Sequence, residues 1–322
     1  MRAKIIGTGS CLPDKIVTND SLSAIVDTSD EWIQSRTGIQ ERHLVSSETE
    51  TTLSMAVTAG QAALENAGIS PTQLDLILVA TVSSDFLTPS TACMVQKALG
   101  ASNAAAFDIN AACSGFLFAL NTVDAYFQAG IYQTALIIGV ETLSKLIDWS
   151  DRSTCVLFGD GAGAVVAKSS EEGMIACLQG SDGSGGDILI CKSRTNNNPY
   201  IHTGTDLDYL YMDGQEVFKF AVKKEPECIH ALLQQAGMQP PDVDYYLLHQ
   251  ANYRIISSIA RKLKLPLEKF PSNVSHRGNT SAASIPILLD EVNRNGLLAE
   301  GNILLLSGFG AGLTWGAALL KW

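Results

Sequence analysis

The sequence reads Leu64-Glu-Asn-Ala-Gly-Ile-Ser-Pro-Thr-Gln-Leu-Asp-Leu-Ile-Leu78, and a similar stretch follows as Leu233-Gln-Gln-Ala-Gly-Met-Gln-Pro-Pro-Asp-Val-Asp-Tyr-Tyr-Leu247. The two glycines, Gly68 and Gly237, lie 169 residues apart (237 − 68 = 169). In each stretch a helix is predicted to end at Ala-Gly, because glycine is the usual residue just after a helix C-terminus. A proline turn, an Asp and a buried strand follow. The chain therefore reads as two related α/β halves, residues 1–170 and 171–322.

Weaker matches extend the repeat. Residues 107–120 resemble residues 270–288, since both run from a phenylalanine through small polar residues into a helix, and residues 135–139 resemble residues 303–307. Strands that alternate with helices predict parallel pairing and layered α/β packing. Chance similarity of two common helix–turn–strand units is the alternative, but the long constant spacing favours duplication. Because ligands bind at strand ends in such sheets, the equivalent loops of the two halves are expected to form one site.

The composition limits the function. The 322 residues are 46% hydrophobic and 17% charged, as in globular proteins with a large core. The net charge of -11 argues against a nucleic-acid partner, because phosphate binding needs a basic surface. A local basic patch could still bind an acidic protein, since salt screens distant charges.

The cysteines and apolar segments predict a cytoplasmic protein. Seven scattered cysteines without a Cys-x-x-Cys motif indicate reduced thiols rather than a disulfide framework or a metal site. The N-terminus lacks the long apolar region of a signal peptide. Residues 303–320 are uncharged, but their four glycines favour two buried strands joined by a loop over a membrane helix.

Cys113 is the candidate nucleophile. It lies between a strand-like segment and an apolar helix-like run, which places its thiol near a helix N-terminus. Unpaired N–H groups and the positive end of the helix dipole favour thiolate there. Thiol pKa values at such positions fall from about 8.5 to roughly 3.5–7.5. A buried structural cysteine is the alternative, and the local sequence leaves it open.

His249 and Asn279 are predicted to share a pocket with Cys113. Of five histidines, His249 alone follows four apolar residues, at the C-terminal edge of a predicted strand. A purely structural role remains open for it, as does an N-cap role for Asn279 or Thr280. The run Phe158-Gly-Asp-Gly-Ala-Gly163 looks like a nucleotide loop, but a strand rather than a helix is predicted after it, which excludes nucleotide binding.

Seven segments in order carry further motifs: Ser29–Ile39, Ala111–Gly115, Asp151–Arg152, Phe158–Gly163, His249–Asn252, Gly278–Ala283 and Gly308–Gly312. Together they resemble β-ketoacyl-acyl-carrier-protein synthase III, the condensing enzyme that starts type II fatty acid synthesis. The resemblance covers essentially the whole chain. It implies the thiolase fold, in which two duplicated halves form five layers (α-β-α-β-α), and a homodimer.

The resemblance also implies a reaction between acyl-CoA and malonyl-acyl-carrier protein, without a metal or redox cofactor. Cys113 would take the acyl group, and the backbone N–H groups of Cys113 and Ala311 would form the oxyanion hole. His249 and Asn279 would donate hydrogen bonds to the malonyl thioester as CO2 leaves. The resulting carbanion would attack the acyl-Cys and give a 3-oxoacyl product.

Binding residues follow from the same resemblance. The CoA contacts would be Trp32, Arg36 and Arg152, and the pantetheine tunnel would be lined by Met212, Gly214, Phe218, Ala251 and Asn252. The carrier protein would dock on Gln250, Ala251, Asn252, Tyr253 and Arg254, beside a basic stretch that runs to Lys264. The acyl pocket would include Leu143, Phe158 and Thr88. Many family members have phenylalanine where Thr88 stands, so a primer longer than acetyl is predicted.

Related enzymes fit less well. A degradative thiolase needs a second cysteine within residues 308–312, and none is there. Chain-elongating synthases use a second histidine where Asn279 stands, and chalcone-synthase-type enzymes lack this combination of motifs. Non-catalytic partner subunits usually lose the cysteine, and nothing resembles the context of a Cys-His-Asn hydrolase. A specialised-metabolism acyltransferase of the same fold remains as the alternative.

Overall fold

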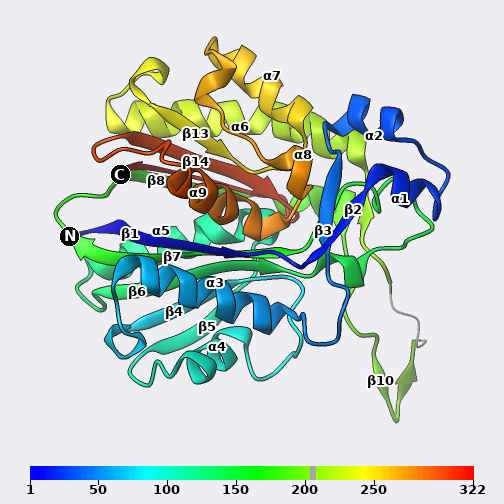
Figure 1. Cartoon of the computed structure of the whole chain (residues 1–322), viewed down its shortest axis with the longest axis horizontal. Helices are drawn as coiled ribbons and strands as arrows, with labels where there is room; N and C mark the ends of the chain where they lie inside the picture. Colours follow the sequence, from blue (N-terminus) through cyan, green and yellow to red (C-terminus); the bar gives the residue numbers. More distant parts are fainter. Residues whose placement is uncertain (204–207) are drawn as a thin grey trace.

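Two β-sheets organise the computed structural model, which describes residues 1–203 and 208–322 (Figure 1). The first sheet has five strands in the order β1-β7-β6-β4-β5. The second has four in the order β8-β15-β14-β13. Their bounds are β1 (Arg2–Cys11), β4 (Leu76–Ala80), β5 (Ala105–Ile109), β6 (Thr134–Glu141), β7 (Gly161–Ser170), β8 (Met174–Ser181), β13 (Tyr245–Leu248), β14 (Ile303–Gly310) and β15 (Thr314–Lys321).

Helices cover both sheets and fill the space between them (Figure 1). One pair packs on the outer face of the first sheet, a second pair lies between the sheets, and a third covers the outer face of the second sheet. This is the α-β-α-β-α layering of the thiolase fold, which confirms the predicted fold class. In that order the pairs are α3 (Thr52–Ala67) with α4 (Thr91–Leu99), α5 (Gly115–Gln128) with α9 (Ser284–Arg294), and α6 (Gly214–Ala236) with α7 (Tyr253–Leu263).

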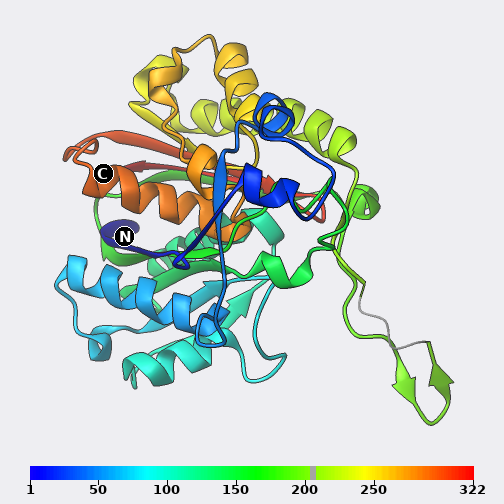
Figure 2. The same cartoon turned by 45° about the vertical axis from the view of Figure 1, so that its right-hand side comes forward.

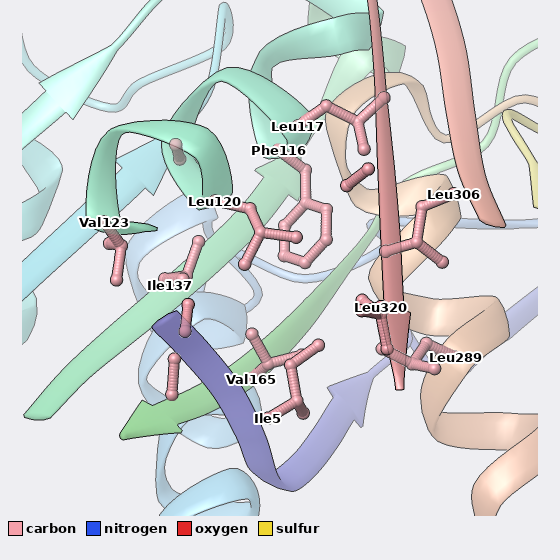
Figure 3. Close-up of a cluster of buried hydrophobic side chains, with 14 of the residues drawn as sticks. Ile5, Phe116, Leu117, Leu120, Val123, Ile137, Val165, Leu289, Leu306 and Leu320 are labelled. Atoms are coloured by element: carbon pink, nitrogen blue, oxygen red, sulfur yellow. The ribbon is translucent and has the colours of Figure 1, made fainter. Parts of the chain in front are cut away.

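A central hydrophobic cluster joins the sheets (Figure 3). Phe116 and Leu120 of α5 and Leu289 of α9 pack between Ile5 of the first sheet and Leu306 of the second. Apolar burial stabilises by roughly 25 cal/mol per Å². The starts of α5 and α9 are therefore held rigidly at the middle of the molecule.

The predicted repeat has a direct structural counterpart. Gly68 and Gly237 end α3 and α6 in the left-handed region, with φ of 64° and 68°. The bounds of β6 and β14 differ by the same 169 residues as these glycines (303 − 134 = 169). The repeated acid has one function in both sheets: the carboxylate of Asp75 accepts from the N–H of Thr134, and that of Asp244 from the N–H of Ile303. Each aspartate thereby fixes where the neighbouring strand begins.

Two details of the sequence prediction were wrong. The strands are not all parallel: β4 pairs in parallel with β5 and β6, and β13 with β14, but β7 and β15 run antiparallel to their neighbours. The connection between β14 and β15 is too short for a parallel crossover. Phe270 follows a short 3-10 turn, and β5 has no equivalent strand in the second sheet. The match of residues 135–139 to 303–307 is also displaced by one residue.

The remaining elements surround one end of the sheets. Residues 303–320 form the two antiparallel strands predicted for them. None of the helices within the described residues is long and apolar enough to cross a membrane. A small hairpin of β10 and β11 projects from the body (Figure 2). The other elements are β2 (Lys15–Thr18), α1 (Asn19–Ser23), α2 (Asp30–Thr37), β3 (Glu41–Leu44), β9 (Leu189–Ile190), β10 (Asn197–Asn198), β11 (Ile201–His202), β12 (Tyr211–Met212) and α8 (Val274–Arg277).

Candidate active site

A cavity of about 930 Å³ opens between the two halves of the molecule. Its wall contains Cys113, His249 and Asn279, three residues that lie far apart in sequence. They come from the turn before α5, the end of β13 and the loop before α9. The structure therefore brings together the residues that the sequence predicted to share a pocket.

Cys113 lies in a single 3-10 turn, Ala112–Ser114, which leads directly into α5. Close backbone packing fixes this turn: a Cβ on Gly310 would lie only 2.7 Å from the backbone N of Cys113. The hydroxyl oxygen of Thr314 lies 3.1 and 3.0 Å from the carbonyl oxygens of Ala111 and Ala311, so its one proton is shared between them. The peptides around Cys113 and Ala311 are thus tied to each other across the cavity wall.

The predicted low thiol pKa is wrong for this state of the protein. The pKa of Cys113 is raised to about 12, chiefly by burial; Ser281 acts to lower it, and the nearby carboxylate of Glu141 contributes to the rise. The sequence reasoning included the helix N-terminus but not the desolvation by the surrounding elements. Cys113 is therefore a neutral thiol at rest, half-buried with access to the cavity.

His249 is buried and oriented by a serine. Its Nδ1 lies 2.6 Å from Ser284 Oγ, and Ser284 Oγ also lies 3.4 Å from the backbone N of Gln250. In the tautomer in which Ser284 Oγ donates to Nδ1, the imidazole proton lies on Nε2. Burial lowers the pKa of His249 to about 3, so the ring is neutral. A neutral ring with a proton on Nε2 is a hydrogen-bond donor.

Asn279 is fixed by its backbone and its side chain. Its N–H donates to Leu157 O at 2.9 Å, and its own carbonyl accepts from Gly159 at 3.0 Å. Its Oδ1 accepts from the N–H of Ser281 at 2.9 Å, so the amide NH2 remains the free end. The glycine-rich run after Phe158 permits this contact, because a Cβ on Gly159 would lie 2.3 Å from Arg277 O. The run packs against the second half and continues into strand β7, as predicted.

Sequence reasoning missed Ser281 and Ser284. Ser281 lies within the motif Gly278–Ala283 and Ser284 directly follows it, but nothing in their spacing distinguishes an orienting hydroxyl from a helix-capping one. Their contacts with Asn279 and His249 depend on elements distant in sequence. Only the equivalence of Ser281 with Ala112, 169 residues earlier, could have identified it as the counterpart of the residue before Cys113.

The predicted CoA contacts form two groups. Met212, Gly214, Phe218, Ala251 and Asn252 line the cavity. Trp32 lies outside it, with the guanidinium carbons of Arg36 and Arg152 at 4.8 and 5.0 Å from its ring centre. Arg36 shares a smaller outer hollow with Gly214, Phe218 and Asn252. A continuous path of predicted residues thus leads from the Trp32 cluster toward Cys113.

The predicted docking segment is only partly exposed. Tyr253 and Arg254 are exposed at the start of α7, and Arg254 lies over the ring of Phe218 at 5.6 Å. Asn252 caps α7 and donates to Arg36 O at 3.1 Å. Gln250 is buried, donates to Leu248 O and accepts from Ser272, so its predicted contact with a carrier protein is wrong. The side chain of Gln250 is buried because it is hydrogen-bonded to two packed segments, at Leu248 and at Ser272.

The predicted acyl-pocket residues also separate. Leu143 and Phe158 are buried and line the cavity. Thr88 is exposed and is not part of this chain's own cavity wall, whereas its neighbour Leu87 is. A contact of Thr88 with a partner subunit's pocket stays a prediction.

Comparison with known proteins identifies the family. Residues 107–183 match the family described as 3-oxoacyl-[acyl-carrier-protein (ACP)] synthase III, and residues 233–322 match its C-terminal family. The chain is 51% identical over 321 residues to the β-ketoacyl-[acyl-carrier-protein] synthase III of Clostridium acetobutylicum, covering 99% of this chain and 98% of that protein. The chain belongs to the β-ketoacyl-acyl-carrier-protein synthase III family.

Solved structures agree with this synthase III assignment. The crystal structure of the Aquifex aeolicus 3-oxoacyl-[acyl-carrier-protein] synthase III superposes with a TM-score of 0.93 at 46% identity, covering 99% of this chain and all of that one. A priming β-ketosynthase of the R1128 polyketide pathway gives 0.92 at 35% identity, covering 99% and 96%. As a member of the synthase III family, this chain is a condensing enzyme and acyltransferase of type II fatty acid synthesis.

Proposed function

We propose that the enzyme condenses an acyl-CoA primer with malonyl-acyl-carrier protein, giving 3-oxoacyl-acyl-carrier protein, CoA and CO2. The observation that supports this most directly is the meeting of Cys113, His249 and Asn279 in one cavity. A nucleophile and two hydrogen-bond donors are what acyl transfer followed by decarboxylation requires. Decarboxylation itself supplies the carbanion, so the reaction needs no metal or redox cofactor.

In the first half-reaction Cys113 attacks the acyl-CoA thioester and keeps the acyl group. The oxyanion that forms is stabilised by the N–H groups of Cys113 and Ala311. The hydrogen bonds of Thr314 to both peptide segments support this pairing, because they hold the two donors in a fixed relation. Preorganised donors avoid the cost of reorientation during the reaction.

In the second half-reaction His249 and Asn279 act on the malonyl thioester. Ser284 leaves the imidazole proton on Nε2, and Ser281 leaves the Asn279 amide NH2 free. Both groups can therefore donate to the thioester carbonyl, where negative charge develops as CO2 leaves. The carbanion then attacks the acyl-Cys113 carbonyl, and the Cys113 thiolate departs.

The two substrates enter along one path. The Trp32 ring with Arg36 and Arg152 suits an adenine and its phosphates, because aromatic stacking and guanidinium contacts combine there. The pantetheine arm would follow the cavity wall past Phe218 and Asn252. Acidic acyl carrier protein would dock on Tyr253 and Arg254 and the exposed basic residues of the following helix, which are Arg261, Lys262 and Lys264.

We also propose that two copies of the chain form a homodimer through β5. This strand is an edge of the first sheet, and Phe107 on it is 37% exposed. The neighbouring loop exposes Phe86 and Leu87, which makes an apolar surface at a strand edge that a second copy could cover. Thr88 in this loop would reach the partner's acyl pocket, where its small side chain leaves room for a longer primer.

The halves 1–170 and 171–322 are proposed as the two duplicated domains, because β7 ends at Ser170 and β8 begins at Met174. Cys113 belongs to the first domain, and His249 and Asn279 belong to the second. Seven free cysteines suit a reducing cytoplasmic compartment.

A specialised priming role is the second candidate. The structural similarity to the R1128 priming ketosynthase favours it, because that protein shares the fold and 35% identity. The two roles differ in the acyl primer or in the acceptor, and both would use the same catalytic residues.

The test uses the purified full chain with malonyl-acyl-carrier protein and acyl-CoAs of increasing chain length, with products followed by mass spectrometry. We expect 3-oxoacyl product that disappears in Cys113→Ser, and the best primer to be longer than acetyl. A sharp preference for acetyl-CoA would contradict the Thr88 hypothesis. Acylated Cys113 without condensation would favour a different acceptor. Light scattering of the same sample tests the homodimer.

A further inference from the structure

The thiol proton of Cys113 needs an acceptor. The thiol is neutral at rest, and the attack on acyl-CoA requires thiolate. His249 is a poor acceptor, because burial lowers its pKa to about 3 and Ser284 occupies its Nδ1. Another group near Cys113 must therefore accept the proton.

Glu141 is a buried carboxylate whose charge acts on the Cys113 thiol. It ends β6 and is fully buried. Its oxygens accept from Ser83 Oγ at 2.5 Å, Ser281 Oγ at 3.1 Å and Val82 N at 3.1 Å, with Thr81 Oγ1 at 3.3 Å. Hydroxyls and one N–H surround it, and within the described residues these hydrogen bonds include no Lys or Arg. Burial raises the pKa of this carboxyl to about 7.

Ser281 connects this carboxylate to the thiol. Its Oγ donates to Glu141 at 3.1 Å, it lines the same cavity wall as Cys113, and its hydroxyl lowers the pKa of that thiol. Its backbone has a φ of 49°, which is rare for a residue other than glycine. Ala112, beside Cys113, has a φ of 47° at the equivalent position of the other half (281 − 112 = 169). Strained backbones of this kind concentrate at functional sites.

We propose that Ser281 passes the thiol proton of Cys113 to Glu141 and returns it later in the cycle. In acyl transfer the S–H bond breaks as the proton moves to Ser281 Oγ, whose own proton moves to the Glu141 carboxylate. The Cys113 sulfur forms the thioester, and the CoA thiolate leaves and takes a proton from water. When condensation releases the Cys113 thiolate, Glu141 returns its proton through Ser281. The relay rests on the proposed role of Cys113 as nucleophile.

A purely electrostatic role for Glu141 predicts the opposite behaviour. As a fixed negative charge near Cys113, Glu141 disfavours the thiolate, so its neutralisation would make the thiol more reactive. As a proton acceptor, Glu141 promotes thiolate formation, so its neutralisation would make the thiol less reactive. The sign of the effect therefore distinguishes the two roles.

The experiment measures the rate of Cys113 alkylation by iodoacetamide from pH 5.5 to 10 in the full chain, by mass spectrometry of the Cys113 peptide. For the wild type we expect the rate to rise through about pH 7 to a plateau. In Glu141→Gln this rise should vanish, and the rate at pH 8 should fall about tenfold or more. Ser281→Ala should show the same loss as Glu141→Gln. Alanine is tolerated at the φ of Ser281, because Ala112 adopts nearly the same value. Glu225→Gln, which also neutralises a fully buried carboxyl, is the matched control and should leave the profile unchanged.

Two results would overturn the relay. One is faster alkylation of Cys113 in Glu141→Gln than in the wild type. The other is a wild-type pH profile in which the alkylation rate does not rise near pH 7. This second result is obtained without any variant, so it does not depend on whether a variant folds. Acylation of wild-type Cys113 by acyl-CoA, measured on the same peptide, separates the relay from the proposed function. If Cys113 is acylated but the pH profile fails, the relay alone is wrong. If Cys113 is neither acylated nor alkylated, the nucleophile assignment is wrong as well.

Discussion

Ser284 Oγ lies 2.6 Å from Nδ1 of His249, and when this hydroxyl donates to Nδ1 the imidazole proton lies on Nε2. The serine is the first residue of α9, and the histidine follows β13. Because α9 is held between the two sheets, the position of the hydroxyl is fixed by the core rather than by the loop around it.

Ser284→Ala should therefore slow condensation more than acylation. Without the hydroxyl, the ring loses its preference for a proton on Nε2, which removes about one hydrogen bond from the decarboxylation step and lowers kcat about tenfold. CoA release from acyl-CoA alone should stay near the wild-type rate. Ser257→Ala, on the exposed side of α7, is the control. An equal loss in both half-reactions would show that Ser284 supports the fold rather than His249.

Gly310→Ala should disable the oxyanion hole. The added Cβ would lie 2.7 Å from the backbone N of Cys113, so that N–H must shift. One misplaced oxyanion donor lowers the rate about 10²-fold or more. Gly183→Ala is the matched control, because open space surrounds its Cβ position. Acylation kinetics with a single acyl-CoA measure the effect, and a normal rate in Gly310→Ala would rule out the Cys113 N–H as a donor.

Trp32→Ala should weaken acyl-CoA binding without slowing the chemistry. The ring interacts with Arg36 and Arg152 outside the cavity, so its loss should raise the KM for acyl-CoA about tenfold and leave kcat unchanged. A short acyl thioester of N-acetylcysteamine lacks the nucleotide and serves as control substrate. Its turnover should be the same in both proteins, and a loss there would mean that Trp32 affects the catalytic cavity.

Arg254→Ala should weaken docking of the carrier protein. Arg254 is exposed beside the cavity and stands over Phe218, so its loss should raise the KM for malonyl-acyl-carrier protein several-fold, and more at low salt. Lys97→Ala removes an exposed charge on the far side, at the end of α4, and should have no effect. If the Arg254 effect persists unchanged at high salt, charge complementarity is not its cause.

Glu225→Gln should stabilise the protein at alkaline pH. Glu225 on α6 is buried, and within the described residues neither carboxylate oxygen has a hydrogen bond of ordinary geometry, although nearby Ser307 lowers its pKa slightly. Burial raises the pKa of Glu225 to about 8. The folded state thus binds more protons than the unfolded state between about pH 4.5 and 8, so this group's contribution to stability falls as the pH rises through that range.

The variant should therefore gain a few kcal/mol over the wild type at pH 8 and little at pH 5. Denaturant titrations at both pH values measure this difference. A difference that does not depend on pH would show that Glu225 is not protonated in the folded protein. Glu268→Gln, in an exposed turn, should change neither value.

Local sequence signals determined much of the fold. The glycines after α3 and α6, the proline turns and the aspartates before β4 and β13 are short-range features, and their spacing revealed the duplication. The candidate residues Cys113, His249 and Asn279 could be found because each stands where a regular element begins or ends. Such positions depend on backbone periodicity and on capping residues, which a sequence displays directly.

Only the tertiary structure decided how these residues behave. Ser281 and Ser284 orient Asn279 and His249 through contacts that no local pattern reveals. The thiol pKa of Cys113 is raised although a helix begins beside it, and Gln250 is buried although its neighbours Tyr253 and Arg254 are exposed. The physical reason is the same in each case: desolvation and hydrogen-bond partners depend on every element packed around a group. Those elements meet only when the two halves close around the cavity.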